Sequence, residues 1–179
     1  MRIAVSGTHG VGKSTLIDEF LHKYPEFAHE PEPYTVLVED FGEEFSAEPS
    51  VEDFRRQLEF NIHRLTHHSA NTNVIYERCP VDFLAYIHAL DPQSAEVLLE
   101  TVSEAMQLLD LIVYIPFDET SGADEYSKLQ RAVDRRLGSI FREDQFGIMS
   151  ATNARIVEAE GPTDHRLRVL EINIKHAAG

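Results

Sequence analysis

The chain has 179 residues, of which 42% are apolar and 26% are charged, and its formal net charge is −15. This length suits one domain spanning 1–179, and this composition predicts a packed core rather than a disordered chain. The acidic balance argues against a general nucleic-acid binder, which would carry a basic face, and the single cysteine argues against a disulfide or a thiolate zinc cluster.

Hydrophobic patterns predict strands that alternate with helices. We expect strands at 2–6, 26–30, 73–77, 110–117 and 154–159. We expect helices at 13–24, 50–70, from Pro80 onward, at 94–109, at 125–143, and after Thr163 as the N-cap of the last helix. Residues 40–49 look like a loop, and Ser50 with Asp53 resembles a capping box. The alternation predicts an α/β fold, with a five-stranded, mainly parallel sheet between two layers of helices.

The stretch GTHGVGKST fits the phosphate-binding pattern G-x-x-x-x-G-K-[ST] and lies between a predicted strand and a predicted helix. In such a loop, glycines let main-chain N–H groups approach an anion, and the helix N-terminus adds further unpaired N–H groups. We expect Lys13 to contact the β- and γ-phosphates during catalysis and Ser14 to bind Mg²⁺. The expected nucleotide-binding residues are Gly7, Thr8, His9, Gly10, Val11, Gly12, Lys13, Ser14 and Thr15.

The stretch YERCPVDFLAY, at 76–86, places an acid and an arginine where a buried strand ends and a helix begins. The carboxyl ends of parallel strands form the edge at which ligands bind in open α/β folds. Glu77 is therefore a candidate to orient the water shell of Mg²⁺, and Arg78 is a candidate to clamp a phosphate. A structural ion pair between these two residues is the alternative.

Together these motifs resemble those of the P-loop nucleoside and nucleotide kinases, which include deoxynucleoside, thymidylate and nicotinamide riboside kinases. Those enzymes carry an Asp-Arg or Glu-Arg motif after the third strand, which Glu77-Arg78 matches. The Pro80, Asp82 and Leu84-Ala85-Tyr86 that follow are most similar to a NadR-like group of AAA-type ATP-binding proteins. The resemblance implies a three-layer, nucleoside-kinase-like P-loop NTPase fold, with ATP and Mg²⁺ as cofactors. Similar kinases are often homodimers.

The resemblance also implies a catalytic base. Glu32, in FAHEPEPY at 27–34, resembles the glutamate that takes the proton from the acceptor hydroxyl in deoxynucleoside kinases. Glu30 is the second candidate and would otherwise contact the substrate. A solvated acidic turn is the structural alternative for both carboxylates.

Further residues are implied to act on the transferred phosphate and on the acceptor. An arginine-rich segment resembles a lid at about 120–147, in which Arg131 and Arg135 share a helix face and would stabilise the developing charge. Gln57 and Asn61 lie on the helix that recognises the acceptor in similar kinases, where Arg78 would also contribute. A salt-bridged surface helix and an exposed polar face are the alternatives.

We therefore expect a kinase that transfers the γ-phosphoryl group of Mg-ATP to a small-molecule hydroxyl or phosphate, on a nucleoside or a nucleotide. A switch ATPase without an acceptor and a nucleotide-sensing module are the competing hypotheses. No Asn/Thr-Lys-x-Asp motif for guanine is present, and the fourth strand lacks a terminal Asp-Glu pair typical of motor ATPases. No apolar run reaches ~18 residues, so we expect a cytoplasmic protein without membrane or nucleic-acid partners.

Overall fold

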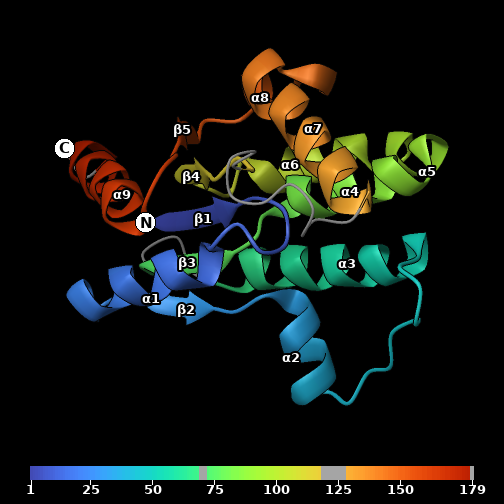
Figure 1. The fold of residues 1–179 in the computed structure, drawn as a ribbon, viewed down its shortest axis with the longest axis horizontal. Coiled ribbons are helices and arrows are strands. Elements are labelled where there is room, and N and C mark those ends of the chain that lie inside the picture. Colours follow the sequence, from blue (N-terminus) through green and yellow to red (C-terminus); the bar gives the residue numbers. More distant parts are fainter. Residues whose placement is uncertain (69–71, 118–127, 178–179) are drawn as a thin grey trace.

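The computed structural model describes residues 1–68, 72–117 and 128–177, and within them it contains one parallel sheet. Its strands follow the order β2-β3-β1-β4-β5, so the first strand lies at the centre (Figure 1). Every neighbouring pair is parallel. The strands are β1 (Arg2–Ser6), β2 (Ala28–Glu30), β3 (Val74–Glu77), β4 (Leu111–Tyr114) and β5 (Arg155–Glu158). The predicted α/β fold with five parallel strands is confirmed.

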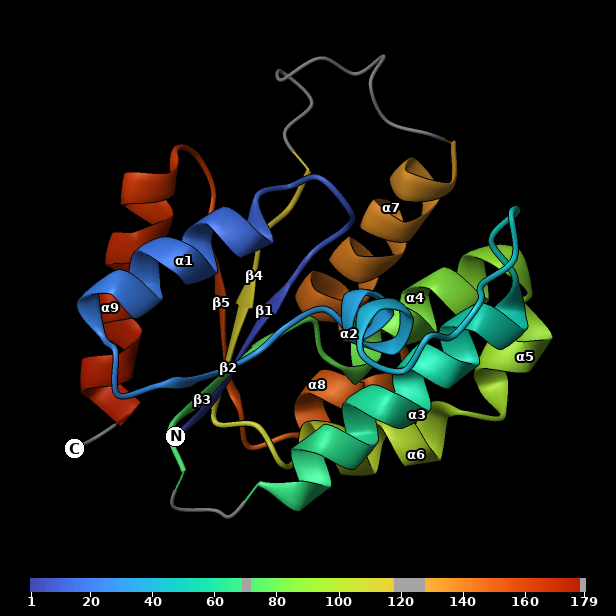
Figure 2. The same ribbon diagram turned by 90° about the horizontal axis from the view of Figure 1, so that it is seen from below.

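Helices cover both faces of this sheet, as Figure 2 shows from below. One face carries α1 (Lys13–Lys23) and α9 (Thr163–Ala177). The other face carries α3 (Val51–His67), α4 (Pro80–Leu90), α6 (Leu99–Met106), α7 (Lys128–Glu143) and α8 (Ile148–Ala151). The short elements α2 (Pro33–Glu39), α5 (Pro92–Glu96) and the 3₁₀ turn η2 (Gln145–Gly147) complete the described chain.

The alternation of side chains along β1 divides the core into two apolar clusters. Ile3 and Val5 pack with α1 and α9, whereas Ala4 between them packs with the helices of the opposite face. All three side chains are completely buried. Successive strand residues point to opposite faces, so a central strand covered on both sides must be apolar throughout.

The observed elements differ from the predicted ones at several places. The expected helix at 94–109 is two helices, α5 and α6, because the chain tightens into a turn at Val97 and Leu98, where the Leu98 N–H group donates to the Ala95 carbonyl oxygen three residues back. The helix α2 was not predicted; Pro33 occupies its first turn, where the missing N–H of proline costs nothing. Thr163 is the first residue of α9 rather than its N-cap.

The remaining predictions concern the lid, the capping box and membrane insertion. The N-terminal part of the predicted lid at 120–147 lies outside the described residues, and α7 forms its central part. Ser50 caps α3 by accepting a hydrogen bond from the Asp53 N–H group, as expected. No helix in the described ranges combines the length and the apolar character that crossing a membrane requires.

Two glycines provide a matched test of the packing around β1 and α7. Gly7 has a φ of 149°, and an added Cβ would lie 2.5 Å from the Ile115 carbonyl oxygen. We expect Gly7→Ala to lower the free energy of unfolding by about 1–3 kcal/mol. An added Cβ at Gly138, inside α7, meets atoms no closer than 3.7 Å. Gly138→Ala should therefore raise the same quantity by up to about 1 kcal/mol. Urea unfolding measures the stability of both variants. If Gly7→Ala left the free energy of unfolding unchanged, the close approach of Gly7 to the Ile115 carbonyl oxygen would be contradicted.

Candidate active site

The loop between β1 and α1 has the backbone conformation that its glycines allow. Gly7, Gly10 and Gly12 have positive φ values of 149°, 85° and 89°. Gly12 immediately precedes α1, whose first residue is Lys13. The N-terminus of α1 therefore opens directly from the loop. This is the arrangement in which main-chain amides and unpaired helical N–H groups bind a phosphate.

Lys13 lies beneath the loop rather than on its surface. Its side chain is 4% exposed, and its Nζ donates a hydrogen bond to the Thr8 carbonyl oxygen at 3.0 Å. Burial, together with the nearby charge of Arg78, lowers the pKa of Lys13 from 10.5 to about 8. The ammonium is thus poorly solvated before any ligand arrives, and an anion in the loop would stabilise its charge.

A hydroxyl and a carboxylate meet beside the loop because β1 and β3 are adjacent strands. The Ser14 Oγ donates a hydrogen bond of 2.8 Å to Oε1 of Glu77, which is the last residue of β3 and is buried. Hydroxyl and carboxylate oxygens, completed by waters and phosphate oxygens, are typical ligands of Mg²⁺. The predicted metal-binding pair is thus brought together.

Arg78 and Glu32 form an ion pair next to the start of the loop. The Arg78 Nε donates to Glu32 Oε1 at 2.5 Å, and its Nη1 donates to the Gly7 carbonyl oxygen at 3.1 Å. Burial alone would raise the pKa of Glu32, but the charges of Arg78 and Lys13 outweigh it and lower that pKa. Burial alone would lower the pKa of Arg78, but Glu32, Tyr86 and Asp82 together outweigh it and raise that pKa. Both groups are therefore charged at neutral pH.

Asp82 fastens the loop to α4 by a buried carboxylate. One oxygen accepts a hydrogen bond from the Gly7 N–H group at 2.9 Å, and the other accepts one from the Cys79 N–H group at 2.8 Å. The same side chain is completely buried and lies 3.7 Å from the Arg78 guanidinium. One turn later, the Tyr86 hydroxyl accepts a hydrogen bond from the His9 N–H group at 3.2 Å. The sequence motif contained both residues, but these contacts were not predicted.

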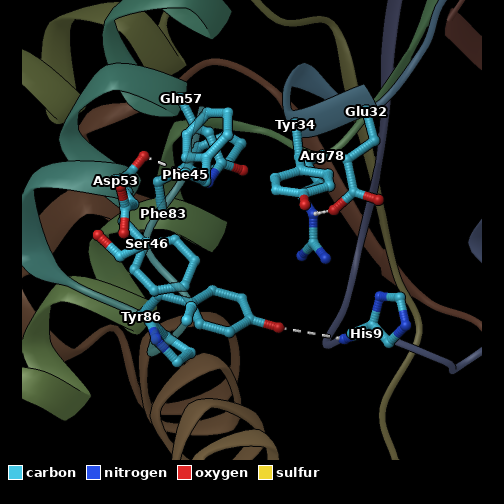
Figure 3. A pocket seen from close by; sticks show the side chains of 13 residues that line it. His9, Glu32, Tyr34, Phe45, Ser46, Asp53, Gln57, Arg78, Phe83 and Tyr86 are labelled. Carbon is cyan, nitrogen blue, oxygen red and sulfur yellow. Dashed lines mark hydrogen bonds and ion pairs between the residues drawn. The ribbon is translucent and has the colours of Figure 1, made fainter. Parts of the chain in front are cut away.

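A cavity of about 320 Å³ lies on the other side of the Glu32–Arg78 pair (Figure 3). Its walls come from α2, α3, α4 and the segment that precedes α3, and they are rich in aromatic rings. Phe54 and Tyr86 stack with their ring centroids 4.5 Å apart, and Tyr34 lies 4.9 Å from Phe45. The lining residues are His9, Glu32, Tyr34, Phe45, Ser46, Ala47, Pro49, Asp53, Phe54, Gln57, Arg78, Phe83 and Tyr86.

The structure separates the predicted acceptor residues into two groups. Gln57 lines the cavity, and its Nε2 donates to the Asp53 carbonyl oxygen at 3.2 Å. Asn61 is completely buried behind it and donates to the Arg78 carbonyl oxygen at 3.4 Å. Glu30 is absent from the lining and pairs instead with Arg64 at 3.0 Å, as well as with His68, the residue that follows α3. Of the two candidate bases, only Glu32 faces the cavity.

The two predicted lid arginines occupy different surroundings on α7. Arg131 follows Gln130, whose Nε2 donates to the His9 carbonyl oxygen at 3.4 Å, so this end of α7 reaches the phosphate loop. Arg135 lines a second cavity together with His88 and Pro92, and no loop residue lines that cavity. The roles of both arginines in phosphoryl transfer stay predictions.

Asp82→Asn tests the fastening of the loop. The amide would present an N–H group to a main-chain N–H donor and would remove the charge beside Arg78. We therefore expect the free energy of unfolding to fall by about 3 kcal/mol. Asp18→Asn, on the exposed surface in the interior of α1, should change stability by less than about 0.5 kcal/mol. Urea unfolding of both variants gives the comparison, and equal stability would show that the Asp82 contacts contribute little.

Comparison with known proteins agrees with this arrangement. A family model described as an AAA domain matches residues 2–148. No curated protein matches the chain significantly. Among solved structures, NadR in complex with NR superposes with a TM-score of 0.68 at 16% identity, over 99% of this chain and 52% of that one. The chain thus spans about half the length of that NadR structure.

Two smaller kinases match over their whole length. Deoxyadenosine kinase from M. mycoides gives a TM-score of 0.67 at 14% identity, over 98% of this chain and 100% of that one. Thymidylate kinase from Ehrlichia chaffeensis gives a TM-score of 0.65 at 14% identity, over 97% of this chain and 98% of that one. At such identities the likeness establishes the fold, which is the predicted P-loop kinase fold. With the match over residues 2–148, the chain belongs to the AAA domain family.

Proposed function

We propose that this protein is a small-molecule kinase that transfers the γ-phosphoryl group of Mg-ATP to a hydroxyl group of a nucleoside-like acceptor. One observation carries the proposal: a phosphate-binding loop and an aromatic cavity meet at a carboxylate, Glu32, that is ionised and faces the cavity. Such a cavity beside the loop favours an enzyme with an acceptor over a protein that only hydrolyses ATP.

The nucleotide side of the site supports the proposal through its charges. Lys13 would contact the terminal phosphates once they displace the Thr8 carbonyl oxygen as its partner. Ser14 and Glu77 fit Mg²⁺ by the chemistry of their oxygens. When bound, the ion would neutralise charge that develops on the phosphate oxygens. Arg131 would approach the same phosphates from the end of α7.

The chemistry assigned to Glu32 is acceptance of one proton. The acceptor hydroxyl oxygen forms a bond to the γ-phosphorus while the bond from that phosphorus to the β–γ bridging oxygen breaks, and ADP leaves. The hydroxyl proton passes to Glu32 and then to water. Because Arg78 and Lys13 lower its pKa, Glu32 is ionised but weakly basic, so it orients the hydroxyl and takes the proton late. Arg78 holds Glu32 in place.

The lining of the cavity favours an acceptor without a phosphate group. Its cationic or potentially cationic side chains are Arg78 and His9, and it also contains the carboxylates of Glu32 and Asp53. The Arg78 guanidinium is already engaged by Glu32 and by the Gly7 carbonyl oxygen. Aromatic walls suit a planar base by stacking, and Gln57 could hydrogen-bond to its edge. We therefore propose nucleosides rather than nucleotides as acceptors.

Release of ADP from Mg-ATP, measured with and without acceptors, tests the function. We expect turnover to depend on an added nucleoside, and each 5′-monophosphate to be a poorer acceptor than its nucleoside. Turnover that ignores every acceptor would favour the switch ATPase instead. A preference for monophosphates would support the proposed kinase activity but would show that the acceptors are nucleotides rather than nucleosides.

Two glutamates provide a matched test of the base in the same assay. Glu32→Gln should lower kcat at least about 100-fold with little loss of ATP binding, because the proton acceptor is removed. Glu30→Gln changes a carboxylate two residues away that faces Arg64, and it should leave kcat within a few-fold of the wild type. If the effects of the two substitutions were exchanged, Glu30 would be the base.

The low pKa of Lys13 predicts a pH dependence of nucleotide affinity. In the free protein this ammonium loses its proton as the pH rises through about 8, so ATP affinity should fall between pH 7 and 9, by at most about tenfold per pH unit. The Lys13→Met variant should bind ATP weakly at every pH. Calorimetric titrations at several pH values measure ATP affinity, which should depend on pH in the wild type but not in the variant. A wild-type affinity that does not change with pH would contradict the lowered pKa of Lys13.

A further inference from the structure

A second cavity, of about 280 Å³, lies between α4, α5 and α7. Figure 1 shows these three helices grouped on one side of the sheet. His88 and Ala89 come from the last turn of α4, and Pro92 begins α5. The α7 residues of the lining recur at helical spacing and share one face. They are Ala132, Arg135, Arg136 and Ser139.

The lining of this cavity is cationic in a chain whose net charge is −15. It contains two guanidinium groups, one imidazole and one hydroxyl, and no carboxylate among the described lining residues. Neither Arg135 nor Arg136 belongs to an ion pair within the described part of the chain. Arg136 donates instead to Oε1 of Gln145, a neutral side chain, at 2.6 Å. The charged groups that act on His88 include Arg136 of the same lining and, more weakly, Glu96 of α5.

We propose that this cavity is a second anion site, which binds a small molecule carrying a phosphate or pyrophosphate group. Guanidinium forks and a serine hydroxyl are groups that recognise phosphate oxygens. The apolar remainder of the lining, Ala89, Pro92 and Ala132, leaves room for a small organic part of the ligand. A cavity of this size suits a small molecule rather than a macromolecule.

The site is separate from the phosphate loop, but its two longer walls both touch that loop. The α4 helix does so through Asp82 and Tyr86, and α7 does so through Gln130. An anion bound between Arg135 and His88 would therefore act on the two helices that hold the loop. This gives Arg135 and Arg136 a task distinct from phosphoryl transfer.

Inorganic pyrophosphate, titrated calorimetrically, is the probe that tests the site. The titration uses Lys13→Ala protein, because the phosphate loop would otherwise bind the same anion. We expect this variant to bind one pyrophosphate, and we expect added Arg135→Gln and Arg136→Gln substitutions to weaken that binding at least about tenfold. Urea unfolding confirms that the variants remain folded. No ATP turnover is measured, so the result is independent of the proposed kinase activity.

Arg155→Gln in the same Lys13→Ala background is the control. Arg155 is an exposed arginine at the start of β5, so this change removes one positive charge that does not line the cavity. It should leave pyrophosphate affinity within about twofold. The proposal is overturned if Lys13→Ala protein binds no pyrophosphate, if loss of both cavity arginines leaves the affinity unchanged, or if Arg155→Gln weakens binding as much as they do.

Discussion

The site depends on one buried carboxylate, that of Asp82. Its two oxygens hold the first amide of the phosphate loop and the amide that begins α4, so two segments 75 residues apart are joined by a single side chain. A carboxylate that accepts main-chain hydrogen bonds in a dry environment is hard to replace, because any neutral substitute leaves a donor unpaired. The same α4 helix supplies Tyr86 to the loop and Phe83 to the cavity. Positions on both sides of the site are therefore set by one helix.

A chain of alternating charges links the nucleotide side to the acceptor side. Glu32 and Arg78 both shift the pKa of Lys13, and Lys13 and Arg78 both lower the pKa of Glu32. Lys13 and Arg78 are buried, and Glu32 is partly buried between them and the cavity. A phosphate entering the loop would stabilise the Lys13 ammonium, and the charge of this ammonium in turn affects the pKa of Glu32 at the cavity. The proposed kinase reaction would use this coupling, since the base is needed only when a nucleotide is present.

The sequence was sufficient to predict the sheet, the loop and the convergence of Ser14 with Glu77. These predictions rest on strong local patterns and on the rule that parallel strands end at one edge. The cavity could not be predicted, because Phe45 and Tyr34 reach it through the path of α2 and the following segment. Helical periodicity grouped Arg131 with Arg135 on α7, but it could not show that Arg135 instead shares a cavity with Arg136 between α4 and α5. Pro33 was interpreted as ending a strand, although a proline can equally begin a helix.

The backbone at Arg78 has a further consequence. Its φ of 77° lies in the left-handed region, where a residue with a β-carbon is disfavoured by about 1–2 kcal/mol and glycine is not. The side chain at this position nevertheless holds Glu32 and the start of the loop. Replacement of Arg78 by glycine would relax the main chain but would remove the guanidinium. The buried carboxylates of Glu32 and Asp82 would then lose their cation, which costs more stability than the relaxed main chain gains. The ion pairs of this side chain therefore keep its own backbone in a conformation that it would otherwise avoid.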